Sequence, residues 1–221
     1  MKKKTEKQLI QARNTYLLSK TKLVLFTLLF VLGMAQSTKA QFQYGIKAGI
    51  GGTCQSELLH LADNTNIRAG YNLGFNTKYR FSEGFALQSG LEYILKGRKV
   101  DETDLNIDEK LHYLQLPVRA EFSAGEKAGF KKGQRIYFAA GPYLSYLLDA
   151  NGKNNGTTFD LKGDTRNFDT GLSLEIGFEF PIFAQHSMQL GLNYDMGFTD
   201  VYKTKTDLNN KMAAVSLGFF F

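Results

Sequence analysis

The sequence has few of the residues that build disulfides, metal centres and catalytic sites. Among 221 residues there are one cysteine, three histidines, three prolines and no tryptophan. The single cysteine, Cys54, excludes a disulfide within one chain. We expect a reduced, partly buried thiol there, because a reactive thiol needs an electropositive environment. No run of small residues leads from the apolar N-terminal segment to Cys54, which argues against a lipoprotein anchor.

The apolar run near the N-terminus is too short to span a bilayer as a helix, for which about 20 residues are needed. This run, Leu23–Ala35, has 13 residues, follows a basic leader and is followed by the small-residue end Thr38–Ala40. That is the plan of a secretory signal peptide. We therefore expect residues 1–40 to be cleaved before Gln41, leaving one domain over 41–221. A retained N-terminal anchor is the alternative, and the short run disfavours it.

The excess of positive charge is confined to that leader. Residues 1–40 hold eight of the 27 Lys and Arg but one of the 21 Asp and Glu, so the rest of the chain carries 19 against 20, a net charge of −1. The pI near 9.2 describes the uncleaved chain. Since nucleic-acid binding needs a basic face on the folded domain, we expect no nucleic-acid partner.

The domain is dominated by strict alternation of apolar and polar residues. From Phe168 to Phe180 every second residue is apolar apart from Thr170, and the residues between them include three carboxylates. We call each of these two alternating sets of residues a parity. A period of two is typical of a β-strand with two different faces. The same pattern predicts eight strands near residues 42–53, 68–81, 85–97, 112–123, 134–148, 166–181, 186–198 and 211–221.

The lengths of the connections alternate as well. The long polar connections are expected at residues 54–67, 98–111, 149–165 and 199–210. The connections 82–84 and 182–185 are very short, and 124–133 is intermediate. This favours an all-β fold, an eight-stranded antiparallel up-and-down transmembrane β-barrel with short periplasmic turns and longer extracellular loops.

The composition of the two faces indicates which one meets lipid. The polar face would gather Gln115 and eight charged residues inside the barrel: Glu92, Lys96, Arg119, Glu121, Asp169, Glu175, Glu179 and Asp195. A soluble barrel would have the apolar face inside instead. The apolar stripe from Tyr71 to Phe81 spans about 33 Å along the strand. At a tilt near 45° this projects to roughly 24 Å, close to the apolar band of such barrels.

Aromatic residues gather at both ends of the apolar stripes, where amphipathic rings favour the membrane interface. We expect an outer girdle of Tyr71, Tyr93, Phe168 and Phe198, and an inner girdle of Tyr79, Phe81, Phe85, Phe122 and Phe180. The chain ends inside a strand, which must pair with the first strand to close the barrel. Phe219 and Phe221 on this strand resemble the signal by which the insertion machinery recognises outer-membrane barrels.

Four short motifs resemble the PorT-like outer-membrane β-barrel domain family, whose members are often called porin-family proteins. The motifs lie at residues 90–97, 113–118, 141–148 and 169–172. The resemblance covers nearly all of 41–221 and implies a small barrel in the outer membrane of a Gram-negative bacterium. Most members of this family have no assigned activity, and the few with one are linked to protein secretion and surface assembly. The resemblance also suggests a bulge or bend at Pro117, because proline forfeits a ladder hydrogen bond, and the same interpretation applies to Pro142 and Pro181.

Other functions are open at this point. The interior charges could form a polar relay, although a self-satisfied structural network is the simpler interpretation, since buried charges must pair. An acyl hydrolase would use His60 or His112, which lie toward the loops, but neither has a recognisable serine and acid. His186 lies at the other end. The stretch Asp149–Asn154 begins like a calcium loop, with Lys153 at a ligand position.

We therefore predict a non-enzymatic barrel without cofactor or metal. Its expected partners are outer-membrane lipid, the barrel-insertion machinery and other envelope proteins that contact its extracellular loops, because binding residues concentrate on loops held by a rigid scaffold. The alternatives are a narrow passive solute channel and a lipid-modifying enzyme. A soluble secreted barrel would have its apolar face and aromatics inside.

Overall fold

The computed structural model describes residues 41–56, 67–102, 105–154, 156–183, 186–204 and 206–221. The predicted signal peptide lies outside these residues and stays a prediction. The strands are β1 (Gln41–Ser56), β2 (Arg68–Ser82), β3 (Phe85–Glu102), β4 (Leu105–Ala124), β5 (Arg135–Asn154), β6 (Thr157–Asp160), β7 (Phe168–Pro181), β8 (Ser187–Asp200) and β9 (Asn209–Phe220). One 3₁₀ turn, η1 (Glu126–Ala128), follows β4. No helix in the described part is long and apolar enough to cross a membrane.

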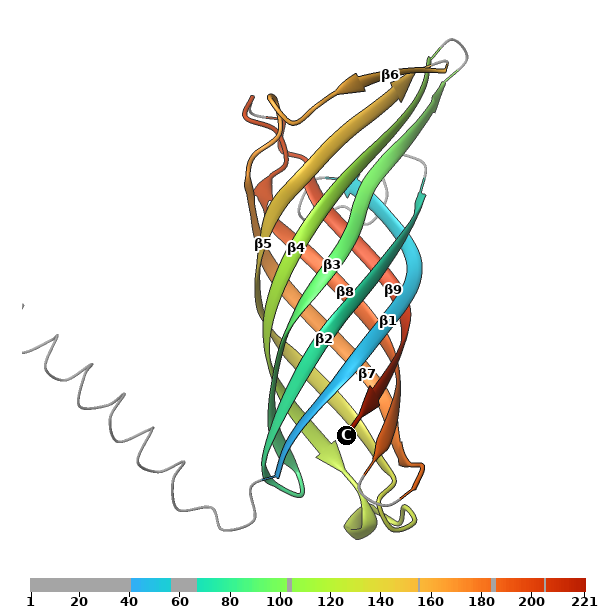
Figure 1. Ribbon diagram of the computed structural model, residues 1–221, viewed down its shortest axis with the longest axis vertical. Helices are drawn as coiled ribbons and strands as arrows, with labels where there is room; N and C mark the ends of the chain where they lie inside the picture. The colour runs from blue at the N-terminus through green and yellow to red at the C-terminus, as the bar shows by residue number, and fades with distance from the viewer. Residues whose placement is uncertain (1–40, 57–66, 103–104, 155, 184–185, 205) are drawn as a thin grey trace, which may run out of the picture. The chain divides into compact units, whose positions relative to one another are not determined.

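Eight of the strands close into one antiparallel barrel (Figure 1). Each pairs with its neighbour in the chain, β5 pairs with β7, and β9 returns to pair with β1. In the closing pair Ile46 lies opposite Phe219, and the Phe221 amide donates to the Tyr44 carbonyl at 2.8 Å. Closure leaves no unpaired edge along the barrel wall, as spanning a membrane with strands requires. The fold class predicted from the sequence is confirmed.

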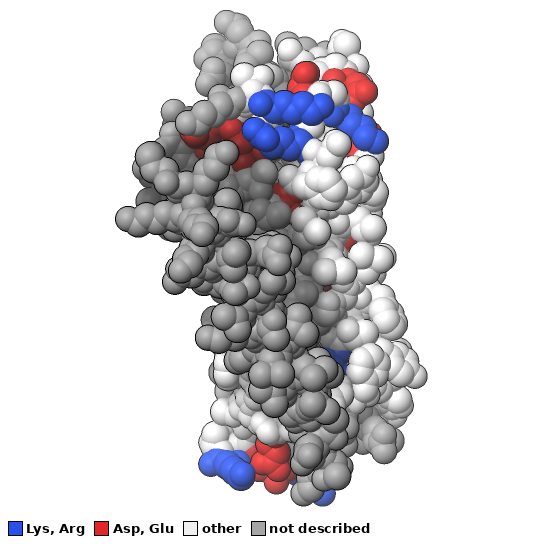
Figure 2. Space-filling model, turned by 90° about the vertical axis from the view of Figure 1, so that its left-hand side faces the viewer, with Lys and Arg blue, Asp and Glu red and all other residues white. Residues whose placement is uncertain are grey.

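The apolar face lies outside and the charged face inside. On β7, Ile176 is 50% exposed whereas Glu175 is 1% exposed. The wall carries large apolar side chains on every barrel strand, among them Ile46, Ile50, Leu73, Phe75, Leu91, Val118, Phe138, Leu144, Leu192, Val215 and Leu217. In Figure 2 the described residues that are visible between the two charged ends are mostly uncharged. This distribution answers the question that the alternation left open: the apolar face is the lipid face.

The connections define two ends of the barrel. The turn end holds residues 83–84, 125–134, 182–183 and 186, and the described ends of β1, β3, β5 and β8 lie at the loop end. At the turn end, rings follow one another from Tyr79 to Phe81 (4.7 Å), Phe85 (5.5 Å) and Phe122 (5.3 Å). At the loop end, the rings of Tyr71 and Tyr93 are 6.1 Å apart. Tyr and Phe thus form the aromatic belts expected at both membrane interfaces.

Two of the predicted loops are wrong, because strands continue into them. β3 and β4 stay paired out to Glu102 and Leu105, and β5 extends to Asn154, where β6 pairs with it. The reason is physical. Beyond the membrane the outer face meets water, so the strand no longer needs apolar residues there and its hydrophobic period disappears while its pairing persists. Figure 1 shows β3, β4 and β5 rising beyond the other strands, with β6 at the tip.

The bulge expected at Pro117 is also wrong in position. The β4–β5 register shifts between His112 and Tyr113, and no shift occurs at Pro117 or Pro142. Around Pro117 the pairing skips two positions without a change of register. The Ser89 hydroxyl donates to the Pro117 carbonyl at 2.9 Å, which supplies one hydrogen bond where the ladder is interrupted. Pro181 ends β7, where a missing N–H is tolerated.

A charge on the lipid face should destabilise this fold in proportion to its depth. Leu192 is 59% exposed on the wall of β8. We expect Leu192→Arg to lower the free energy of folding into phospholipid vesicles by about 2–4 kcal/mol if the site is near the bilayer midplane. The measurement is a urea titration of vesicle-embedded protein.

The matched control is Thr158→Arg on β6, which is exposed beyond the barrel. We expect this variant to fold like the wild type. Equal stability of the two variants would mean that the wall of β8 does not meet hydrocarbon.

Candidate functional site

The lumen is filled by charged side chains that come from both halves of the chain. Its buried cations are Lys47, Lys78, Arg80, Lys96 and Arg119, and its buried anions are Glu92, Glu109, Glu121, Asp169, Glu175, Glu179 and Asp195. All five of these cations lie on β1–β4. Three of the seven anions lie on β7, on the opposite side of the ring. The ion pairs between them therefore cross the lumen.

The central layer is held by Arg119. Its guanidinium lies 2.9 Å from Glu175 and 3.1 Å from Glu92. Lys47 reaches Glu175 from the other side of the lumen at 2.5 Å. All four side chains are at most 4% exposed, so each charge depends on its partners rather than on water.

The layer toward the turn end is built around two carboxylates. Lys78 lies 2.9 Å from Glu121 and 2.7 Å from Glu179. Arg80 lies 3.2 Å from Glu179, and Gln189 donates to the same carboxylate at 2.8 Å. These groups come from β2, β4, β7 and β8, which Figure 1 shows at different positions around the barrel.

The layer toward the loop end is built around Asp169. Lys96 lies 3.2 Å from this carboxylate, and the Tyr143 hydroxyl donates to it at 3.2 Å. Gln115 accepts from Lys96 at 3.1 Å and donates to Asp195 at 2.8 Å. The ammonium of Lys96 also lies 4.3 Å from the centre of the Tyr143 ring, a cation–π contact.

Two lumen tyrosines lie over glycines of the facing strand. Tyr143 pairs in register with Gly171, and Tyr137 pairs with Gly177. A Cβ at Gly171 would lie 2.7 Å from the Tyr143 ring, and one at Gly177 would lie 2.6 Å from the Tyr137 hydroxyl. Only glycine leaves room for these rings. The Tyr137 hydroxyl donates to Glu175 at 2.7 Å, so the rings also complete the network.

Little space remains between these layers. A void lined by Glu92, Arg119, Asn193 and Asp195, among others, measures about 10 Å³. This is close to the least volume that one water molecule needs. An eight-stranded barrel is just wide enough for its own side chains to fill, which agrees with the three layers of described side chains.

The loop end of the lumen is closed by a small hydrophobic cluster. Its buried members are Leu111, Tyr113, Leu147, Ala150 and Val201, with Leu161 and Tyr202 packed against them. Val201 and Tyr202 come from the connection after β8, so this connection folds over the mouth. Arg98 binds Glu109 through two hydrogen bonds of 2.8 and 3.1 Å. Tyr202 donates to the same carboxylate, and burial together with the Glu109 charge raises the pKa of Tyr202.

The connection after β8 is itself tied down by Asp200. Its carboxylate accepts the Thr206 hydroxyl at 2.7 Å and the Thr206 amide at 2.9 Å. Burial acts to raise the pKa of Asp200, but these hydrogen bonds, with that of the Asp207 amide, outweigh it and lower the pKa. The fixed connection holds Val201 and Tyr202 over the lumen.

The strand extensions form a separate surface beyond the barrel. We call residues 98–102, 105–111, 150–154 and 157–160 the protruding sheet. In this sheet β4 pairs with β5, with Asp108 opposite Lys153. β6 pairs with β5 as well, from Asn151 opposite Asp160 to Asn154 opposite Thr157. All four residues of β6 are exposed, and within the described part of the chain β6 pairs with β5 alone. This edge therefore offers backbone groups to a further strand.

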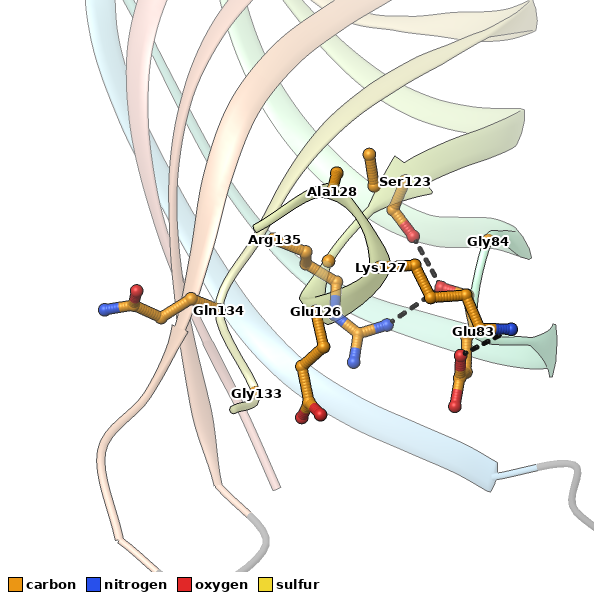
Figure 3. Close-up of a pocket in the computed structure, with 11 residues that line it drawn as sticks. Glu83, Gly84, Ser123, Glu126, Lys127, Ala128, Gly133, Gln134 and Arg135 are labelled. Atoms are coloured by element: carbon orange, nitrogen blue, oxygen red, sulfur yellow. Dashed lines mark hydrogen bonds and ion pairs between the residues drawn. The ribbon is translucent and has the colours of Figure 1, made fainter. Parts of the chain in front are cut away.

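A pocket of about 530 Å³ lies at the turn end (Figure 3). Arg135 donates to the Glu83 carbonyl at 3.1 Å across it, and Ser123 donates to the same carbonyl at 3.0 Å. Lys127 and Glu83 face each other at 3.5 Å, but their side chains are 92% and 82% exposed. Such an exposed pair adds little rigidity.

The structure brings the eight charged residues named from the sequence into the lumen, each at most 7% exposed. Sequence reasoning missed Lys47, Lys78 and Arg80, although each shares its parity with the polar face of its strand. It also missed the tyrosines of the network, because a buried Tyr and a lipid-facing Tyr look alike in the sequence. Phe219 and Phe221 lie at the end of the closing strand, their rings 4.9 Å apart, and their role as an insertion signal stays a prediction.

The residues considered for catalysis and calcium do not gather into one site. His60 lies outside the described residues. His112 Nδ1 lies 2.5 Å from the Tyr93 hydroxyl at the outer surface, and the His186 ring stacks on Phe219 at 5.9 Å. Asp149–Asn154 is part of β5 rather than a loop, which corrects that expectation. Within the described residues no group of three or more His, Cys, Asp or Glu could hold a metal ion.

Residues 34–203 match the family described as outer membrane protein beta-barrel domain. No curated protein matches the sequence. Similar solved structures include Ail, the attachment invasion locus protein of Yersinia pestis, at 16% identity and a TM-score of 0.43, covering 82% of this chain and 99% of that one. Neisserial surface protein A is 13% identical with a TM-score of 0.49, covering 81% and 97%. The N-terminal barrel domain of Pseudomonas aeruginosa OprF is 15% identical with a TM-score of 0.44, covering 83% and 100%.

Removing the central guanidinium should destabilise the barrel strongly. Arg119→Ala leaves Glu92 without its ion-pair partner and Glu175 with Lys47 alone. Breaking a buried pair from one side costs about 3–5 kcal/mol. We expect the free energy of unfolding to fall by that amount and the band shift on boiling to occur at a lower temperature. The control is Lys127→Ala, at the exposed pair with Glu83, which should change neither the free energy of unfolding nor the temperature of the band shift. If Arg119→Ala also left both quantities unchanged, Arg119 would not be part of the network.

Proposed function

Because the chain belongs to the outer membrane protein beta-barrel domain family and lies in the bacterial outer membrane, we propose that it is a non-enzymatic, non-conducting barrel that displays the protruding sheet at the cell surface. The sheet and the loops beside it contact other envelope or extracellular macromolecules. The protruding sheet is the observation that carries this proposal. Strands of about 9–11 residues suffice to cross the membrane, yet β4 and β5 have 20 residues each.

The open edge of β6 suggests the kind of partner that would bind there. An extended polypeptide can add as a further strand to an open sheet edge, with its backbone groups supplying the affinity. β6 offers such an edge, and its side chains, Phe159 among them, are exposed. We propose an envelope or surface protein with an extended segment as the partner, in keeping with the PorT-like resemblance, which stays part of the proposal. The signal peptide over residues 1–40 and the insertion signal at Phe219 and Phe221 would serve export and assembly.

A narrow solute channel is the second candidate, and the filled lumen argues against it. Ion pairs span the lumen in three layers, and the connection after β8 covers its mouth. An ion would have to separate buried charges that are 2.5 to 3.2 Å apart. That separation is costly in a low-dielectric interior. An enzyme has less support, because among the described residues His112 hydrogen-bonds to the Tyr93 hydroxyl rather than to a serine, although Asp149 lies opposite it.

The proposed orientation is tested by labelling intact cells. In a Cys54→Ser background, Thr158→Cys and Lys131→Cys each add one exposed thiol, at the protruding sheet and at the turn end. A polyethylene-glycol maleimide too large for porins should label Thr158→Cys on intact cells and label Lys131→Cys only after the cells are broken. Both variants should react after lysis. Labelling of Lys131→Cys on intact cells would invert the proposed topology.

The absence of conductance is tested in planar bilayers. We expect the purified wild-type protein to insert without stepwise currents, since no ion can pass the three layers without breaking ion pairs. A general porin in the same bilayers is the positive control, and the band shift on boiling shows that the added protein is folded. Reproducible current steps from the folded wild type would favour the channel.

A further inference from the structure

Outward-facing cations gather on one side of the barrel, just beyond the aromatic residues of the loop end. The strands β2–β5 carry them. We call this surface the rim face: its members are Arg68, Lys99, Asp108, Lys110, His112, Asp149, Asn151 and Lys153. Register places all of them except Arg68 on the outer side of neighbouring strands, with Lys99 opposite Asp108, Lys110 opposite Asn151, and Asp149 opposite His112. Arg68 shares the inward parity of β2 and pairs with Thr53, but its guanidinium reaches Asp108.

The rim face has an excess of positive charge. Four of its side chains are cationic and two are carboxylates. Arg68 Nε lies 2.5 Å from Asp108, which neutralises that carboxylate, and Asn151 donates to Asp149 at 2.6 Å. Lys110 and Lys153 are exposed, and no ion pair to them occurs among the residues that the structure describes. Two ammonium groups are thus available to an external anion.

The height of these lysines matches the lipid headgroups. The Tyr71–Tyr93 pair marks the membrane interface, and His112 is bound to the Tyr93 hydroxyl at 2.5 Å. Lys110 lies two residues beyond His112, and Lys153 lies four beyond Asp149. With a rise of about 3.3 Å per residue and a tilt near 45°, they lie roughly 5 and 9 Å above the rings. The headgroup layer on each side of a bilayer is about 5–8 Å thick.

Exposed cations are fewer on the rest of the described barrel. The outward positions near the loop ends of β1 and β8 hold Cys54 and Phe198. On β9, Lys211 pairs with Cys54, but it is 3% exposed and donates to Ser56. The exposed Arg166 lies two residues before Phe168 of β7, the strand next to β5. A uniform ring of snorkelling cations would surround the whole barrel, whereas these cations lie on one side. The hydroxyls of Tyr71 and Tyr93 lie below the rim-face lysines, and a tyrosine hydroxyl can hydrogen-bond to a sugar or a phosphate oxygen. The Tyr93 hydroxyl is bound to His112 as well.

We propose that the rim face is a binding site for phosphorylated glycolipid headgroups of the outer leaflet, with Lys110 and Lys153 holding a phosphate and the Tyr71–Tyr93 pair contacting the adjoining sugar. The ligand class follows from the charge and the depth of the site. Cations near a membrane surface attract anionic lipids, and the effect falls as salt increases. The inference uses the orientation in the proposed function, with the loop end outward, but not the partner of β6.

The test uses full-length folded protein in detergent with diphosphoryl lipid A as the probe. Native mass spectrometry counts the bound lipid for the wild type, for Lys110→Gln/Lys153→Gln, and for the control Lys131→Gln/Lys132→Gln. The control removes the same charge from exposed positions at the turn end. We expect lipid A to bind the wild type and the control alike. Binding to the Lys110 and Lys153 variant should weaken by roughly tenfold or more, as expected for two cations lost near an anionic surface.

Two further arms identify the source of the phosphate. Lipid A with its phosphates removed should bind the wild type as weakly as it binds the Lys110 and Lys153 variant. Inorganic phosphate at the same concentration as the lipid should not displace lipid A. Equal binding to wild type and Lys110→Gln/Lys153→Gln, or equal binding of dephosphorylated lipid, would overturn the site. Displacement by inorganic phosphate would overturn the lipid assignment and leave a simple anion site.

The band shift on boiling shows whether each variant is folded before lipid is added. Cell labelling separates the failures: if Thr158→Cys labels on intact cells but lipid A binding is unchanged in the lysine variant, the rim-face inference fails while the proposed display function stands. If lipid A binds through these lysines while labelling shows the loop end facing the periplasm, the topology of the proposed function fails instead.

Discussion

The structure depends on one constraint: charges enclosed by a membrane-spanning wall must satisfy each other. The wall has to be apolar outside, and a strand that is apolar on one parity places its other parity in the lumen. Eight strands enclose a lumen too narrow for bulk water, so those polar groups must find partners inside. Arg119, between Glu92 and Glu175, shows how one side chain satisfies carboxylates from two different strands.

The positions of the positive and negative charges along the chain link this network to closure of the barrel. Lys47, Lys78 and Arg80 lie on the first two strands, whereas Glu175 and Glu179 lie on β7. A half-formed barrel would leave these cations without most of their partners. The ion pairs therefore favour the closed ring over open sheets, in the same direction as the backbone hydrogen bonds between β1 and β9. The same ion pairs span the lumen, so closure of the barrel and filling of its interior have the same cause.

The sequence predicts the parts that the membrane dictates. Lipid forces alternation from Phe168 to Phe180 and along the other strands, and the eight strands and the inward carboxylates follow from that period alone. Beyond the membrane no such rule acts, so the strand pairing of residues 98–111 leaves no periodic signal. The rim face was equally hidden, since Lys110 and Lys153 are far apart in sequence and become neighbours only through the register of β4 and β5. The bulge at His112 could not be predicted either, because proline was the only visible cue and it lies elsewhere.

The glycines beneath Tyr137 and Tyr143 have a consequence for the sliding of strands. Alternation by itself forbids a slip of one residue, which would turn the polar face into lipid, but it permits a slip of two. If β5 slid by two residues along β7, Tyr143 would meet Asp169 or Ser173, and Tyr137 would meet Glu175 or Glu179, where side chains occupy the room that glycine leaves. The two rings and their glycines thus select one register of β5 on β7 among those that the hydrophobic pattern allows.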